Sequence, residues 1–327
     1  MMHSRVFAVL AFACAPVALH AGAAFAQFPE KPVRIVVGTA PGGPTDILTR
    51  IFAPALSKQL GQQIVVDNKP GASGALAIES VVKSPADGYT LIIGSESEFA
   101  VGPVIYRKLP YDVAKDLSPV AGVASLYNVL VVNPATGIGS LKEFVDRAKG
   151  APGKVVYGSG GAATPSHLFA ALFSLAAGVE LLHVPYKGAG PALADLMGGH
   201  VQAMFIGGPA GMNPVKAGKL RALAVTGSSR AAQLPDVPTF GEAGVKSPEL
   251  EQSFWWSIMG PAGLDAAVSG KLAAALGTAL RQPETRTQFD NQGLTPRFDD
   301  AQGVRRQLEK DREKWARVVK AAGITVE

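Results

Sequence analysis

The stretch IVVGTAPGGPTDILTR, residues 35–50, leads from an apolar β-type run through a glycine-rich turn into a predicted helix that begins at Pro44. It nearly matches a nucleotide-binding loop, since four residues separate Gly38 from Gly43 and Thr45 follows at the matching place. Pro44 stands where that loop has the lysine that meets the β- and γ-phosphates. Proline has neither charge nor N–H, and it suits the first position of a helix. The turn therefore predicts an anion-binding loop that lacks the cation for a triphosphate.

The first 26 residues predict a secretory signal peptide. They contain an early arginine, an apolar centre and the small-x-small sequence Ala24-Phe25-Ala26, so we expect cleavage near Ala26. No later run reaches the ~18 apolar residues that span a bilayer, and the mature chain from 27 to 327 is expected to be soluble and exported. The single cysteine, Cys14, lies in this leader, which leaves no disulfide or cysteine metal ligand. Ala11 replaces the leucine of a lipobox and disfavours lipid attachment at Cys14.

Composition favours two α/β lobes and no nucleic-acid partner. Hydrophobic residues make up 47% and charged residues 17% of the 327 residues, a length that suits two packed lobes better than one small domain. The formal net charge is +5, but the basic residues are scattered singly and form no stripe for nucleic acid. This mild positive balance favours anionic small molecules only weakly. We expect a monomer.

Apolar β-type runs alternate with helical stretches twice along the chain. Strands are predicted at 33–37, 63–66, 89–93, 129–132, 155–158, 180–184, 201–206 and 220–225. Helices are predicted at 44–60, before Ser84, and at 140–149, 164–177, 191–197, 264–281 and 300–321. This order predicts parallel, doubly wound α/β sheets.

The two alternations predict two lobes. We expect residues 27–125 plus 227–300 in lobe 1, residues 126–226 in lobe 2, and residues 301–327 as a C-terminal helix that packs on the lobes. An aromatic strand is predicted at 254–259. Trp255 and Trp256 are neighbours on it and point to opposite faces, so we expect at most one of them in the core, while the other meets a helix or the second lobe.

Three loops rich in small residues follow predicted strands: GTAPGGPT (38–45), GSESEF (94–99) and GSGGAAT (158–164). Ligands of open parallel sheets lie beyond the carboxyl ends of the strands, and backbone N–H groups at helix starts hold a carboxylate without Arg or Lys. The alternative is that these residues only cap helices, a role that we expect for Asp46 and Ser73. The candidate ligand-binding residues are Thr39, Ala40, Gly42, Gly43, Ser95, Ser97, Glu98, Ser159, Gly160, Gly161, Thr164 and Gly207.

Catalytic patterns are sparse. The sequence GASGA (71–75) resembles a nucleophile elbow, but Ala75 replaces the final glycine, so Ser73 is expected to cap a helix. His167, His183 and His200 are too far apart for a helical metal site, and each is expected to be structural or on the surface. We expect no catalytic residue, no cofactor and no metal. An exported hydrolase would need a nucleophile with a base within reach.

Eight ordered motifs cover the mature chain and resemble the Bug family of periplasmic solute receptors, the substrate-binding components of tripartite tricarboxylate transporters. They are PEKPVRIVVGTAPGGPTDILTR, DNKPGASG, KSPADGYTLIIGS, YRKLPYDVAKDLSPV, YGSGGAATPSHLFAALF, HVPYKGAGPALADLMGGHV, GKLRALAVTGSSRAAQLPDVPTFGEAGV and WARVVKAAGITVE. The resemblance implies a two-lobed Venus-flytrap periplasmic binding fold of type II that closes over a small organic carboxylate, often a dicarboxylate, an aromatic acid or an amino acid. It also implies capture by main-chain amides and ordered waters from the three loops. The partner is either a membrane permease or, for an orphan receptor, a sensor kinase.

The chain departs from the family pattern in the loops. Gly38-Thr39 stand where members often have Pro-Phe or Pro-Tyr, so the pocket is expected to lack an aromatic wall and to be roomier. Ser97-Glu98 replace small residues, Ala162-Ala163 replace Asn-Gly, and Ile206 replaces a polar residue. Because of these departures, the exact ligand of a named relative is not assigned to this chain.

Glu98 has two interpretations. Ser95 and Glu98 have the spacing of a capping box, in which the serine accepts from a helix N–H and the carboxylate accepts from the serine's own N–H. Alternatively, Glu98 points into the cleft, where it would favour the ammonium or ring N–H of an amino acid or nitrogen-containing carboxylate.

Overall fold

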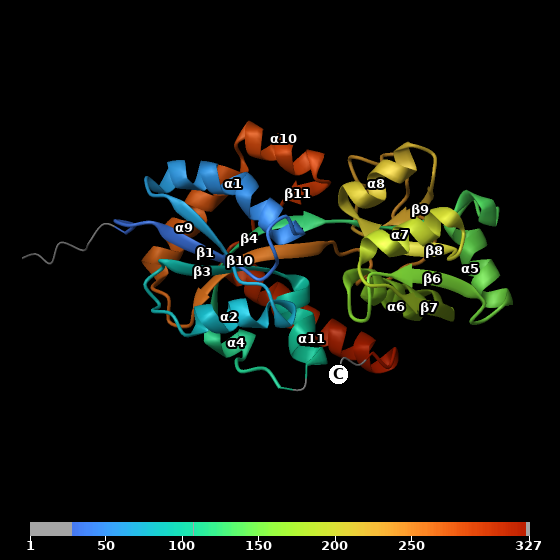
Figure 1. Ribbon diagram of the computed structural model, residues 1–327, viewed down its shortest axis with the longest axis horizontal. Helices are drawn as coiled ribbons and strands as arrows, with labels where there is room; N and C mark the ends of the chain where they lie inside the picture. The colour runs from blue at the N-terminus through green and yellow to red at the C-terminus, as the bar shows by residue number, and fades with distance from the viewer. Residues whose placement is uncertain (1–27, 107, 325–327) are drawn as a thin grey trace, which may run out of the picture.

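The computed structural model describes residues 28–106 and 108–324, which form two sheets flanked by helices (Figure 1). The predicted signal peptide lies outside the described residues. The two sheets lie in separate halves of an elongated molecule (Figure 1). The predicted two-lobed α/β fold is therefore confirmed.

The six-stranded first sheet has the order β11-β4-β10-β3-β1-β2. Its strands are β1 Val33–Val37, β2 Ile64–Asn68, β3 Thr90–Ser95, β4 Leu117–Leu126, β10 Phe254–Pro261 and β11 Leu294–Pro296. The first three run parallel, as expected, while β10, β4 and β11 each pair antiparallel with their neighbours. In Figure 1, one face of this sheet carries α1 Pro44–Leu60, α9 Ala266–Leu280 and α10 Pro283–Asn291, and the other carries α2 Ala75–Val82, α4 Val113–Asp116 and α11 Ala301–Ala321. The short α3, Gly102–Ile105, precedes α4.

The five-stranded second sheet has the order β7-β6-β8-β5-β9. Its strands are β5 Asn128–Val132, β6 Val155–Ser159, β7 Leu181–Pro185, β8 Ala203–Gly207 and β9 Arg221–Val225. Helices α5 Leu141–Gly150 and α6 Pro165–Ala177 pack on one face, and α7 Ala189–Gly198 and α8 Gly208–Lys216 pack on the other. β6, β7 and β8 are parallel to one another, whereas β5 is antiparallel to both of its neighbours. Both sheets are thus mixed, not purely parallel.

The opening stretch of the chain folds as its residues predict. Every residue of β1 except Arg34 is buried, which fits a strand with helices on both faces. Pro44 occupies the first turn of α1, and Gly61 ends the helix with a left-handed φ of 69°.

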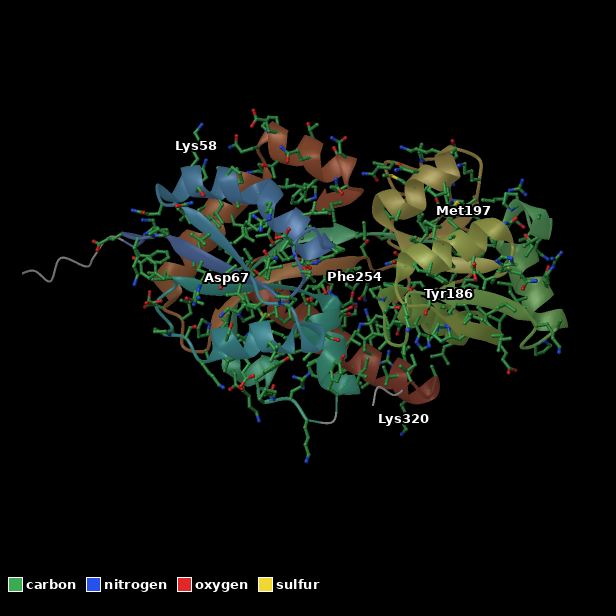
Figure 2. All side chains as sticks on the ribbon, in the orientation of Figure 1. Lys58, Asp67, Tyr186, Met197, Phe254 and Lys320 are labelled. Atoms are coloured by element: carbon green, nitrogen blue, oxygen red, sulfur yellow. The ribbon has the colours of Figure 1, made fainter. Side chains whose placement is uncertain are left out.

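Only Tyr127 separates β4 of the first sheet from β5 of the second. The end of β4, Leu126, pairs with Phe254, and the start of β5, Asn128, pairs with Gly207. Phe254 lies near the middle of the molecule in Figure 2. In the first sheet, the carboxyl end of β3 lies beside the start of β10, which is next to the connection at Tyr127. In the second sheet, β8 ends beside Asn128 on the other side of this connection, and β6 runs parallel to β8. The carboxyl ends of the parallel strands in both sheets therefore lie at the edges that face each other.

A second connection runs beside the first. After β9 the chain returns to the first sheet through residues 226–253. The N–H of Asn128 donates to Thr226 Oγ1 at 2.9 Å, and the N–H of Thr226 donates to the Asn128 carbonyl at 2.8 Å. These two hydrogen bonds hold the two connections together where they pass between the sheets. The predicted lobe boundaries at 125/126 and 226/227 stay predictions.

Some elements differ from the sequence-based expectation. The elements α3, β4, α4, α8, α10 and β11 were not predicted. β4 and α8 contain proline and glycine residues, which are typical of loops. Trp255 and Trp256 are both in the core, so the expectation that at most one would be buried was wrong. Helices cover both faces of the strand: Trp255 Nε1 donates to Asp311 of α11, and Trp256 Nε1 donates to Thr45 of α1.

Candidate ligand-binding site

The three small-residue loops lie at the facing edges of the two sheets. We define loop 1 as residues 38–43 after β1, loop 2 as residues 95–98 after β3, and loop 3 as residues 159–164 after β6. Loops 1 and 2 belong to the first sheet and loop 3 to the second. Loops 1 and 2 meet through Gly74, since a Cβ on Gly38 would lie 2.8 Å from the Gly74 Cα, and a Cβ on Gly74 would lie 2.9 Å from the Glu98 Cγ.

Loop 1 is closed by hydrogen bonds at the start of α1. Gly43 is the N-cap residue, and Gly42 has a φ of +81°. The Gly42 N–H donates to Asp46 Oδ2 at 2.9 Å, and the Gly43 N–H donates to the Ala40 carbonyl at 3.0 Å. Asp46 therefore contacts the helix start, and the two glycine N–H groups already have acceptors, Asp46 of α1 and Ala40 of loop 1.

Asn68, at the end of β2, braces loop 1 and was not identified from the sequence. Its Nδ2 donates to the Thr39 carbonyl at 3.0 Å and to Asp46 Oδ1 at 2.9 Å. Arg50 donates to the same Asp46 oxygen at 2.9 Å and to Asn68 Oδ1 at 3.0 Å. Burial alone would raise the pKa of Asp46, but hydrogen bonds from Arg50, Gly42 and Asn68 hold it below its usual value.

Loop 2 places Glu98 on Ser95. The Ser95 N–H donates to Glu98 Oε2 at 2.6 Å, which is the return bond of a capping box. The Ser95 hydroxyl donates to the same oxygen at 2.5 Å. A π-helical turn, Ser97–Val101, follows. Burial raises the pKa of Glu98, and its bonds to Ser95 oppose this. Glu98 thus makes the return bond of the predicted capping box, but the N-cap residue of this turn is Glu96 and it has no side-chain cap bond. The choice between the two interpretations of Glu98 stays a prediction.

Loop 3 is held by its own side chains. Ser159, which is fully buried, accepts from the Gly161 N–H at 3.1 Å. Ser166 accepts from the Gly160 N–H at 3.0 Å, and the Thr164 hydroxyl donates to the Gly161 carbonyl at 2.8 Å. Thr164 is the N-cap residue of α6, and Pro165 is its first residue, so this helix start has the same small-residue–proline order as the start of α1.

Two histidines support loop 3. His167 and His183 stack with ring centroids 3.9 Å apart, and His183 stacks on Tyr157 at 4.9 Å. The Ala163 N–H donates to His167 Nδ1 at 3.1 Å, and His183 Nε2 lies 2.6 Å from Ser159 Oγ. Both histidines are thus structural, as expected, but the sequence did not reveal that they meet. His183 pairs with Tyr157 across parallel strands, a register that sequence spacing does not show.

Ser73 does not cap α2, so that expectation was wrong. The N-cap residue is Gly74, without a side-chain cap. Ser73 has a φ of +51°, and its hydroxyl accepts from the Tyr106 hydroxyl at 2.6 Å. Gly207 ends β8 and is the N-cap residue of α8, and a Cβ there would lie 2.8 Å from the Tyr127 carbonyl oxygen. A side chain at position 207 would therefore collide with the backbone at Tyr127, which is a packing reason for glycine there. The predicted contact between Gly207 and a ligand stays a prediction.

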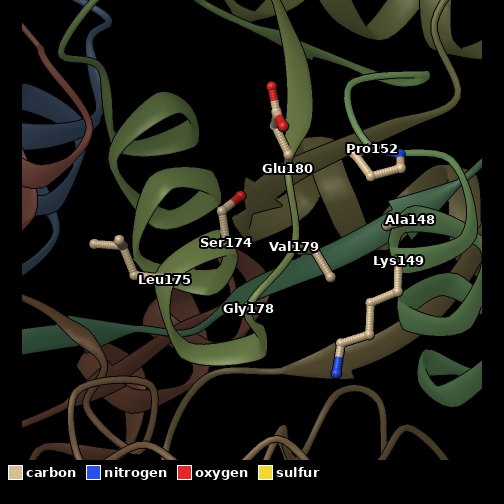
Figure 3. A pocket seen from close by; sticks show the side chains of 8 residues that line it. All are labelled: Ala148, Lys149, Pro152, Ser174, Leu175, Gly178, Val179 and Glu180. Atoms are coloured by element: carbon tan, nitrogen blue, oxygen red, sulfur yellow. The ribbon is translucent and has the colours of Figure 1, made fainter.

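A surface hollow of about 460 Å³ lies away from the three loops, between the C-terminal ends of α5 and α6 (Figure 3). Its lining includes Lys149, Leu175 and Glu180. Helix C-termini carry partial negative charge, which disfavours an anion. A second hollow of about 210 Å³ lies beside α11 and is lined by Lys310 and Arg317, among others. Neither hollow contains a residue of loops 1 to 3.

Among the described residues, no cluster of His, Cys, Asp and Glu is arranged to hold a metal ion.

Comparisons with known proteins identify relatives over nearly the whole chain. Residues 48–324 match the sequence model of the tripartite tricarboxylate transporter family receptor. Protein BugT of Bordetella pertussis is 36% identical over 99% of both chains. A solved R. palustris protein with adipate is 35% identical, has a TM-score of 0.77, and is aligned over 91% of this chain and 99% of its own. MatC of Rhodopseudomonas palustris, solved with bound malate, is 30% identical, has a TM-score of 0.73, and is aligned over 89% of this chain and 100% of its own.

Within the described part of the chain, no helix combines the length and the apolar character needed to cross a membrane.

Replacing Glu98 by glutamine distinguishes its two interpretations. Glutamine keeps an oxygen acceptor for the Ser95 N–H, so we expect affinity for a dicarboxylate and for an amino acid to stay within about twofold of wild type. Isothermal titration calorimetry with a dicarboxylate and with an amino acid measures the two affinities. A loss of about tenfold for the amino acid alone would instead assign Glu98 to the ligand's ammonium group.

His167 is expected to make stability depend on pH. Burial, and then the neighbouring His183, lowers the pKa of His167 from 6.5 to about 4. The unfolded chain therefore binds this proton more readily, and stability present at neutral pH is lost as the pH falls from about 6.5 towards about 4. His167→Asn keeps an acceptor for Ala163 but does not titrate, so its urea midpoint should fall less steeply with pH. The control is His200→Asn at an exposed site, and equal slopes for His167→Asn and wild type would contradict this role.

Proposed function

Because the chain belongs to the tripartite tricarboxylate transporter receptor family, we propose that it captures a small organic carboxylate between its two lobes outside the cytoplasm. The captured acid is then delivered to the membrane permease of a transporter of this class. In this proposal the chain is a receptor and not an enzyme, and it reaches the periplasm after cleavage near Ala26.

Two helix starts carry the proposal. α1 begins at Pro44 beside loop 1, and α6 begins at Pro165 beside loop 3, at the facing edges of the two sheets. The N–H groups of a first helical turn have no acceptor within their helix and carry partial positive charge. A carboxylate between the edges would receive hydrogen bonds from both lobes. Such an anion needs no lysine or arginine, because the helix starts supply the charge.

Two buried hydroxyl groups support the same location. Thr39 Oγ1 in loop 1 and Ser97 Oγ in loop 2 are buried and have no hydrogen-bond partner among the described residues. Buried polar side-chain atoms are usually paired with protein or ordered water. These hydroxyls are therefore suited to a ligand oxygen, or to a water that bridges to one.

The proposed ligand class is a small dicarboxylate. Two solved relatives hold adipate and malate, each with two carboxyl groups. With one helix start in each lobe, an acid that carries a carboxylate at each end can contact both. Glu98 is already bound to Ser95, so its carboxylate is not required for an ammonium group.

The proposal predicts that dicarboxylates stabilise the protein. A ligand that binds only the folded state at 100 times its dissociation constant adds about 2.7 kcal/mol of stability. We expect adipate or malate to raise the melting temperature in a thermal-shift assay, while matched ionic strength from sodium chloride does not. A panel of mono-, di- and tricarboxylates and amino acids that produces no shift would contradict the proposal.

A matched pair of glycine variants tests the location. Gly42 and Gly137 have φ values of +81° and +72°, and a Cβ on either meets nothing within 4 Å. Valine at either place strains the backbone similarly, so both variants should lose similar stability. Only Gly42→Val is expected to lose the response to adipate or malate, because only residue 42 belongs to loop 1. Equal ligand responses in the two variants would remove loop 1 from the site.

A further inference from the structure

A buried cluster of charges ties loop 2 to the C-terminal helix α11. Lys314 Nζ lies 2.6 Å from Glu96 Oε1 and 2.8 Å from Asp311 Oδ1. The exposed fractions of the residues Lys314, Glu96 and Asp311 are 3%, 1% and 0%. Burying such charges is costly unless each is paired and hydrogen-bonded. Glu96 lies in loop 2 between Ser95 and Ser97, so α11 fixes the backbone of this loop.

Trp315 adds a directional bond to the same carboxylate. Its indole Nε1 donates to Glu96 Oε1 at 2.6 Å. A comparable bond exists on the neighbouring acid, since Trp255 Nε1 donates to Asp311 Oδ2, also at 2.6 Å. The two bonds differ in what they hold: the first holds a residue of loop 2, and the second holds a residue of α11 itself.

Trp315 also contacts the second sheet's helix α6. Its ring meets the ring of Phe169 edge to face, with centroids 5.9 Å apart and an angle of 85° between the planes. The residues are 1% and 2% exposed, so water is excluded from this contact. In Figure 1 the end of α11 extends beneath the second sheet, near α6. Phe169 lies one turn after the start of α6 at Pro165, directly behind loop 3.

One side chain thus contacts both halves of the proposed site. Trp315 is hydrogen-bonded to loop 2 through Glu96 and packed on the helix that begins at loop 3. When α6 moves relative to the first sheet, Phe169 moves against a ring whose orientation is fixed by the Glu96 carboxylate. A packed contact of this kind favours discrete arrangements over continuous deformation.

We infer that Trp315 is a positioning residue that couples loop 2 to loop 3, so that closure on a carboxylate depends on the bond from its indole N–H to Glu96. This inference rests on the proposed function, because it assigns a role in closure to residues outside the ligand contacts.

The test compares Trp315→Phe with Trp255→Phe. Each variant keeps an aromatic ring and removes one buried indole N–H bond to a carboxylate, so both should lower the melting temperature to a similar extent. Calorimetry with adipate or malate, whichever stabilises wild type more, should show a loss of about tenfold in affinity for Trp315→Phe. Trp255→Phe should bind within about twofold of wild type, because Asp311 keeps its bonds from Lys314 and Gln307 and the cluster on Glu96 is left in place.

A second variant and a spectroscopic readout complete the test. Phe169→Leu leaves the bond to Glu96 intact and removes the edge-to-face contact, and it should show the same loss of affinity as Trp315→Phe. With Trp255 and Trp256 replaced by phenylalanine, Trp315 is the remaining tryptophan, and its emission should change on addition of the acid. Affinity unchanged in both Trp315→Phe and Phe169→Leu would overturn the inference and leave the proposed function intact. A wild-type chain that binds none of the acids would overturn both.

Discussion

The one-residue connection between β4 and β5 is the constraint on which the site depends. With only Tyr127 between the strands, the end of the first sheet and the start of the second must lie close together. The bonds between Asn128 and Thr226 hold the returning connection at the same place. The carboxyl ends of the parallel strands then face each other, and loops that are distant in sequence lie on the two sides of one space. The site is thus a consequence of topology before any side chain is considered.

In the proposed site the ligand would be recognised by backbone N–H groups, and the two nearby carboxylates are bound within the loops. Asp46 is bound by Gly42, Asn68 and Arg50, and Glu98 is bound by Ser95. Either carboxylate would repel an anion in the proposed site if it pointed towards it without a partner. Both are instead bound by donors within their own lobe, and in the proposed site the partial positive charges of the helix starts would attract the ligand carboxylate.

Local patterns in the sequence predicted much of the fold, while the location of the ligand site stays a prediction. Pro44 and Gly61 gave both ends of α1, because their backbone preferences act within a few residues. β4 was missed because its proline and its glycine are typical of a loop, and it is a strand through its pairing with β10 and β11. Contacts such as His167 with His183 and Trp315 with Glu96 depend on strand register and helix packing. Sequence spacing carries no information on such contacts, so these supporting residues required the structure.

Small-angle X-ray scattering tests most directly whether the two facing edges hold one ligand between them. A ligand that contacts both lobes stabilises only the conformation in which the lobes are close, so it shifts the population towards a more compact state. The account predicts that a saturating concentration of the acid that stabilises the protein lowers its radius of gyration. Calorimetric binding together with a scattering curve that stays open and unchanged would contradict it, because the ligand would then be held by one lobe alone.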